Sequence, residues 1–134
     1  MITKLMRVTI VVRDEEEALN FYTEKLGFVQ RADETFGPGV RWLTVAPRDQ
    51  KHLEIVLQKP NPLLHGEAGA KELEERIGKG TAWVFGTDDC RKTYETLKAR
   101  GVKFLSPPQE QHYGVQAIFE DLYGNQFVLV EPRP

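Results

Sequence analysis

Residues 8–28 read VTIVVRDEEEALNFYTEKLGF, and this stretch decides the fold. Its first five residues are all β-branched, which predicts a strand buried on both faces. Asp14 is a candidate N-cap for a helix whose first turn is acidic, and Gly27 stands where that helix would end. The helical spacing places four apolar side chains on one face: Ala18, Leu19, Tyr22 and Leu26.

Three more strands are predicted before the middle of the chain. They cover residues 28–32, 41–46 and 52–58. The turn FGPGV at 36–40 separates the first two, and residues 47–51 form the second turn. The first part of the chain therefore has the order strand, helix, strand, strand, strand.

The same order recurs after residue 80, and this repeat is the most informative feature of the chain. A strand at 81–87 precedes Asp89, which is a candidate cap for a helix at 90–100, and Gly101 ends that helix. Further strands are predicted at 102–106, 113–121 and 126–131, with a break at the two prolines 107–108. The two parts also end alike, in EIVLQKP and VLVEP.

We therefore predict one α+β domain over residues 1–134. It contains two tandem βαβββ modules, at 1–58 and 80–134. Residues 59–79 form a linker with a short helix at 70–77, and this segment could also act as a lid.

Composition excludes several classes of protein. The net charge is −2, which does not suggest binding to nucleic acid or to an anionic membrane. No apolar stretch approaches the roughly 18 residues that span a bilayer. A single cysteine, Cys90, cannot form an intramolecular disulfide, and this favours the reducing cytoplasm. Cys90 also has no base near it in sequence, so we predict an unreactive thiol.

Three pieces of the chain carry a family resemblance. They are FYTEKLGF at 21–28, the middle piece at 102–121 and the closing FEDLYGNQFVLVEP at 119–132. On these pieces the chain resembles the glyoxalase/bleomycin-resistance/dioxygenase (vicinal oxygen chelate) superfamily. The resemblance implies two modules whose half-sheets curl into a mixed sheet around a central cleft. It leaves the activity open, since members include isomerases, dioxygenases, thiol transferases, epimerases and metal-free binding proteins.

The resemblance also implies four metal-ligand positions, one on each of four strands and usually occupied by His, Gln or Glu. Three of them carry side chains that are not usual ligands: Arg7, Ala82 and Val128. A guanidinium has donors and no acceptor, so Arg7 cannot bind a cation. Only Glu54 fits, and we therefore expect no cofactor, with a divalent metal ion as the alternative.

Glu54 has three possible environments. It can form an ion pair with Arg7, because the resemblance places both in the cleft. It can be a metal ligand together with His52, which lies two residues earlier and would share a strand face with it. It can also be exposed to solvent, since Glu is rarely buried without a partner.

The candidate ligand-binding residues combine charge with aromatic surface. They are Arg7, Trp42, Glu54, Trp83, His112 and Tyr113. Aromatic side chains in a concave sheet would stack on a planar ligand, although Trp42 and Trp83 could instead pack in the core. His112 could reach a ligand or merely mark the start of a strand.

The resulting hypothesis is a metal-independent binding protein for a small, partly aromatic or anionic molecule, acting as a cytoplasmic homodimer. The alternative is a metal-dependent enzyme, such as a glyoxalase-like lyase, an isomerase or a ring-cleaving type of dioxygenase. Its site would use His52, Glu54 and His112. A third possibility is an interaction protein whose cleft is filled by its own side chains.

Overall fold

In the computed structural model, which describes residues 1–134, the opening stretch forms β1 (Arg7–Val11) and a helix that changes type half-way. The α-helical part, α1, covers Glu15–Asn20, and the π-helical part, η1, covers Phe21–Lys25. Asp14 caps α1 as predicted, because its Oδ1 accepts a hydrogen bond of 3.0 Å from the Glu17 amide. Gly27 has a φ of 78°, the left-handed conformation that ends many helices.

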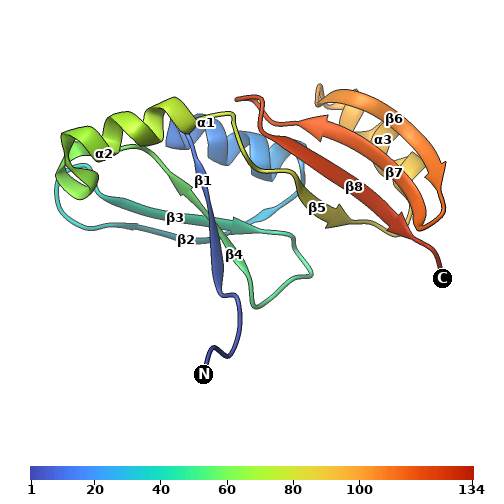
Figure 1. The fold of residues 1–134 in the computed structure, drawn as a ribbon, viewed down its shortest axis with the longest axis horizontal. Helices are drawn as coiled ribbons and strands as arrows, with labels where there is room; N and C mark the ends of the chain where they lie inside the picture. Colours follow the sequence, from blue (N-terminus) through green and yellow to red (C-terminus); the bar gives the residue numbers. More distant parts are fainter. The chain divides into compact units, whose positions relative to one another are not determined.

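The first sheet has the strand order β1-β4-β3-β2 (Figure 1). Its other strands are β2 (Val29–Thr35), β3 (Arg41–Ala46) and β4 (Glu54–Gln58). β1 pairs in parallel with β4, and the other pairs are antiparallel. The strand predicted from residue 52 begins only at Glu54, so His52 lies in the preceding loop.

The segment expected to be a linker contains α2 (Pro62–Arg76), which is longer than the predicted short helix. Asn61 caps it, Pro62 occupies its first turn, and Gly66 interrupts it with a non-helical φ of 74°. The Asn61 side chain also donates a hydrogen bond to the Gly39 carbonyl, so the start of α2 is tied to the turn between β2 and β3. Contacts between Cα atoms group α2 with the first module, in a unit that covers Met1–Ile77.

The second unit, Gly78–Pro134, repeats the plan of the first. Its strands are β5 (Trp83–Gly86), β6 (Lys103–Gln111), β7 (Gly114–Glu120) and β8 (Gln126–Pro132), in the order β5-β8-β7-β6. The helix α3 covers Cys90–Ala99, and Asp89 caps it through a 3.0 Å hydrogen bond from the Lys92 amide. The predicted fold class, α+β with two tandem βαβββ modules, is confirmed.

The prediction that the two prolines end a strand is wrong. β6 continues through Pro107 and Pro108, and its pairing with β7 shifts register between Ser106 and Gln109. β6 is an edge strand, so one side of it has no ladder hydrogen bonds for a proline to remove. The register shift is a β-bulge, and it accommodates the part of β6 where the prolines cannot pair with β7.

In each module a helix packs against the sheet: α1 contacts β4 in the first module, and α3 contacts β6, β7 and β8 in the second. In the first module the helix-covered face holds fully buried aliphatic side chains: Ile10, Leu43, Val45, Ile55 and Leu57. Arg41 lies on this face too, and its Nη2 atom forms a 2.8 Å ion pair with Glu16 of α1. Because side chains alternate along a strand, the residues between these lie on the opposite face of the sheet.

No helix of the structure is both long enough and apolar enough to cross a membrane.

Candidate functional site

The first module brings Arg7 and Glu54 together on the face opposite α1. The two residues stand directly opposite each other in the parallel β1–β4 pair. Arg7 Nε lies 3.5 Å from Glu54 Oε2, and the two side chains are 41% and 27% exposed. The ion pair with Arg7, one of the three environments considered for Glu54, is therefore present in a half-exposed position.

Trp42 and Thr44 of β3 complete this cluster. The Arg7 guanidinium carbon lies 5.5 Å from the centroid of the Trp42 ring, within the range of a cation–π contact. The Thr44 hydroxyl donates a 2.7 Å hydrogen bond to Glu54 Oε1. We call the side of the sheet that carries these four residues the Arg7 face.

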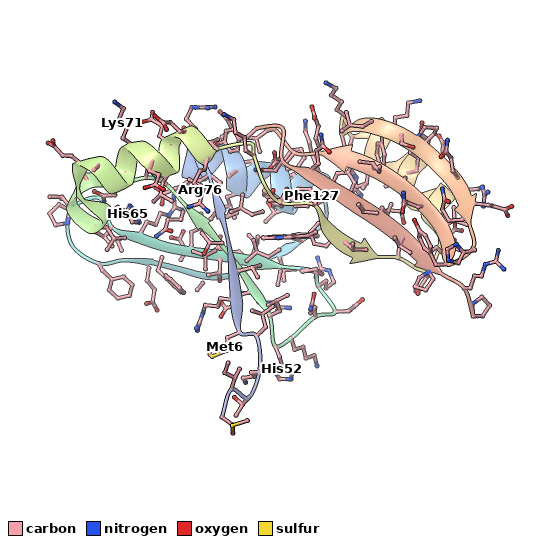
Figure 2. All side chains as sticks on the ribbon, in the orientation of Figure 1. Met6, His52, His65, Lys71, Arg76 and Phe127 are labelled. Carbon is pink, nitrogen blue, oxygen red and sulfur yellow. The ribbon has the colours of Figure 1, made fainter.

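Trp83 has a different environment. It stands opposite Phe127 in the β5–β8 pair, and the two ring centroids are 5.9 Å apart. Phe127, labelled on β8 in Figure 2, is fully buried and belongs to a group of aromatic rings that continues through Phe119 and Phe104 to Tyr94 of α3. Trp83 therefore lies on the helix-covered face of its sheet, where core packing accounts for its position.

His112 and Tyr113 form the exposed turn between β6 and β7. Their rings meet edge to face with centroids 5.4 Å apart. The Tyr113 hydroxyl donates a hydrogen bond to Gln116 Oε1. Gln116 alternates with the core residues Val115 and Ala117, so its side chain lies on the face of the second sheet opposite α3. His112 and Tyr113 therefore remain candidates for ligand contact.

Comparison with known proteins identifies the family. The model of the Glyoxalase/Bleomycin resistance protein/Dioxygenase superfamily matches residues 4–129. The chain belongs to this superfamily. Among curated proteins, YurT of Bacillus subtilis is 38% identical over 131 residues, which are 96% of this chain and 98% of YurT.

Two solved structures are similar to this chain over nearly its full length. The crystal structure of UcmS2 has a TM-score of 0.88 and 41% identity, and the match covers 98% of this chain and 99% of UcmS2. TnmS3, described as an antibiotic binding protein from Streptomyces sp. CB03234, has a TM-score of 0.79 and 30% identity, with 98% of each chain covered.

The register of the strands corrects the mapping of the superfamily's metal-ligand positions. Equivalent 2.9 Å hydrogen bonds, from the Val12 amide to the Gln58 carbonyl and from the Thr87 amide to the Val130 carbonyl, align the two modules. Counting back from these carbonyls makes Gln126 the counterpart of Glu54. Glu54 and Val128, which the sequence mapping treated as corresponding positions, are therefore offset, and the counterpart of Val128 is Val56.

Neither consistent set of positions fits a metal centre. One set consists of Arg7, Glu54, Ala82 and Gln126, and the other of Arg7, Val56, Ala82 and Val128. The first offers two oxygen donors and the second offers none, whereas catalytic sites commonly use about three protein ligands. No group of three or more His, Cys, Asp or Glu side chains in the chain could hold a metal ion.

His52 does not share a strand with Glu54. It is exposed in the loop that precedes β4, and Figure 2 shows it at the same end of the first module as Met6. Together with Leu5 and the loop residues 49–53, it lines an open surface depression rather than the Arg7 face. The pairing of His52 with Glu54 on one strand face was therefore wrong, because the strand starts later than its alternating pattern predicts.

Sequence reasoning missed Thr44. This residue is fully buried, yet its hydroxyl orients the Glu54 carboxylate. The available signal was its position two residues after Trp42 in a predicted strand, which places both side chains on one face.

Proposed function

We propose that this protein binds a small, partly aromatic or anionic molecule without the help of a metal ion, and that the Arg7 face contributes to the binding site. The observation that carries the proposal is the ion pair between Arg7 and Glu54 beside the Trp42 ring. Arg7 supplies hydrogen-bond donors next to the flat surface of Trp42, a combination suited to binding a ring that carries oxygen atoms.

Two further observations support this function over metal-dependent catalysis. The ligand positions of the superfamily carry Arg7 and Ala82, which cannot bind a divalent cation. TnmS3, which is 30% identical to this chain, is described as an antibiotic binding protein. Binding in place of turnover is therefore our preferred role for this chain.

Metal analysis of the protein, purified in buffer with dilute zinc, manganese and iron salts, tests the metal-free part of the proposal. We expect a metal content far below one ion per chain, and the same content in Glu54→Ala. One tightly bound ion per chain that is lost in Glu54→Ala would overturn the proposal and favour a lyase, isomerase or dioxygenase instead.

A thermal-shift screen tests the binding part. A compound that binds only the folded state stabilises it by about 2.7 kcal/mol at a concentration of 100 Kd, which raises the melting temperature measurably. We expect hits among aromatic compounds that carry oxygen atoms. Arg7→Gln should weaken these hits, whereas the matched control Arg48→Gln, in the exposed turn between β3 and β4, should not.

We also propose that the protein acts as a cytoplasmic homodimer. The one cysteine is free and buried, which suits a reducing compartment. Light scattering coupled to gel filtration should give twice the mass of one 15.3 kDa chain, and a monomer at micromolar concentration would contradict the dimer.

A further inference from the structure

We infer that the Arg7 face selects aromatic molecules whose polar edge is an uncharged hydrogen-bond acceptor, and that Glu54 is the positioning residue that sets this preference. The inference rests on the proposed function and narrows it, because that function leaves aromatic and anionic ligands equally open.

Arg7 keeps free donors although it is held at two points. Its Nε contacts Glu54 at 3.5 Å, and its guanidinium carbon lies 5.5 Å from the centre of the Trp42 ring. The two Nη groups donate no hydrogen bond within the chain, and the side chain is 41% exposed. A guanidinium that already has two contacts loses less conformational freedom on binding an oxygen acceptor through its Nη groups than an unrestrained one would.

Glu54 is engaged by its neighbours and is not positioned to bind a ligand itself. Its Oε1 accepts the 2.7 Å hydrogen bond from the fully buried Thr44 hydroxyl, and its Oε2 faces Arg7. Both carboxylate oxygens therefore have partners on the protein. Its contribution to binding is to orient the guanidinium and to neutralise its charge.

The charges on the Arg7 face disfavour an anionic ligand. Glu54 cancels the charge of Arg7, and Glu34 stands opposite Trp42 in the β2–β3 pair and adds a further negative charge to this face. The other residues of this face on β1, β3 and β4 are uncharged: Thr9, Val11, Thr44, Ala46, Val56 and Gln58. A carboxylate approaching Arg7 would therefore meet repulsion from Glu54, whereas a carbonyl or amide oxygen would accept the same hydrogen bonds without that repulsion.

Two probes that share one ring system and differ in charge test this preference. The first is 2-naphthamide, which is neutral, and the second is 2-naphthoate, which is ionised at pH 7.5. Isothermal titration of the full chain should show tighter binding of the amide. Glu54→Gln keeps an oxygen that can accept the Thr44 hydrogen bond but removes the charge, so it should shift the amide-to-carboxylate preference toward the carboxylate by about tenfold.

Glu34→Gln is the matched control, since it removes the same charge from the same face without touching Arg7. It should shift the preference less than Glu54→Gln does. Tighter binding of naphthoate by the wild type, or equal shifts in the two variants, would overturn the inference. If neither naphthalene binds while other compounds raise the melting temperature, the inference fails and the proposed binding function stands.

Discussion

The hydroxyl of Thr44 donates a 2.7 Å hydrogen bond to Glu54 Oε1, joining a fully buried side chain of β3 to a half-exposed carboxylate of β4. This hydrogen bond orients the Glu54 carboxylate, whose other oxygen contacts Arg7. The orientation of Arg7 therefore depends on a residue that does not touch it.

Thr44→Val should test this dependence, because valine has nearly the shape of threonine but no donor. We expect a loss of about 0.5–1.5 kcal/mol in the free energy of unfolding, the usual net value of one hydrogen bond. Urea denaturation followed by tryptophan fluorescence measures it. Binding of any compound found by thermal shift should weaken as well, and unchanged affinity would show that Glu54 does not need Thr44.

Gly78→Ala should destabilise the second module severely. A Cβ atom at Gly78 would lie 2.1 Å from the Tyr123 carbonyl oxygen, and φ at this position is 79°. Gly80→Ala is the matched control, since φ there is 86° but no atom lies within 4 Å of the added Cβ. The control should cost about 1–2 kcal/mol of unfolding free energy from the backbone conformation alone. Equal costs in the two variants would contradict the predicted clash.

Asp33 should make stability depend on acid pH. The Arg41 guanidinium donates hydrogen bonds of 2.8 Å and 2.7 Å to the two carboxylate oxygens of Asp33 and holds the pKa of this carboxyl below its usual value. The unfolded chain therefore takes up the proton first as the pH falls. The stabilisation is fully present above the unfolded pKa of about 4 and is lost as the pH falls through the folded value.

Asp33→Asn checks this sign. The difference in unfolding free energy between wild type and variant should be larger at pH 7 than at pH 3, as measured by urea denaturation at both. Asp49→Asn, in the exposed turn between β3 and β4, should show no such change. A difference for Asp33→Asn that grows toward pH 3 would refute the assigned direction.

Cys90 should be inert in the folded protein. Its side chain is fully buried, and burial, followed by the nearby charge of Glu131, raises the pKa of the thiol. The thiolate is the reactive form, so both effects suppress its chemistry. Ellman's reagent at pH 8 should modify Cys90 only at the rate at which the module unfolds, and at once in guanidinium chloride. Rapid modification of the native protein would show that the site is accessible.

Much of the fold could be predicted from local patterns. Asp14 and Asp89 cap helices as their positions suggested, and Gly27 and Gly101 both have positive φ after helix ends. These features depend on residues close in sequence, so short-range chemistry decides them. The continuation of β6 through two prolines could not be predicted, because it depends on this strand lying at the edge of its sheet.

Some features of the candidate site could likewise be predicted from the sequence, and others depended on the tertiary structure. Sequence reasoning paired Arg7 with Glu54, and the structure contains that ion pair. It gave Trp83 the same role as Trp42, yet alternation alone cannot say which face of a strand a helix will cover. Trp83 lies on the face that α3 covers, and Trp42 lies on the face opposite α1.

The sequence by itself determined the two βαβββ modules and the family of this protein, because caps, turns and strand patterns are properties of neighbouring residues. It also excluded Arg7 and Ala82 as metal ligands, because ligand chemistry belongs to the side chain alone. Only the tertiary structure decided that Arg7, Trp42, Thr44 and Glu54 share one face. They lie on three strands that are far apart in the chain, and the register of β1, β3 and β4 brings them together through backbone hydrogen bonds that no local pattern encodes.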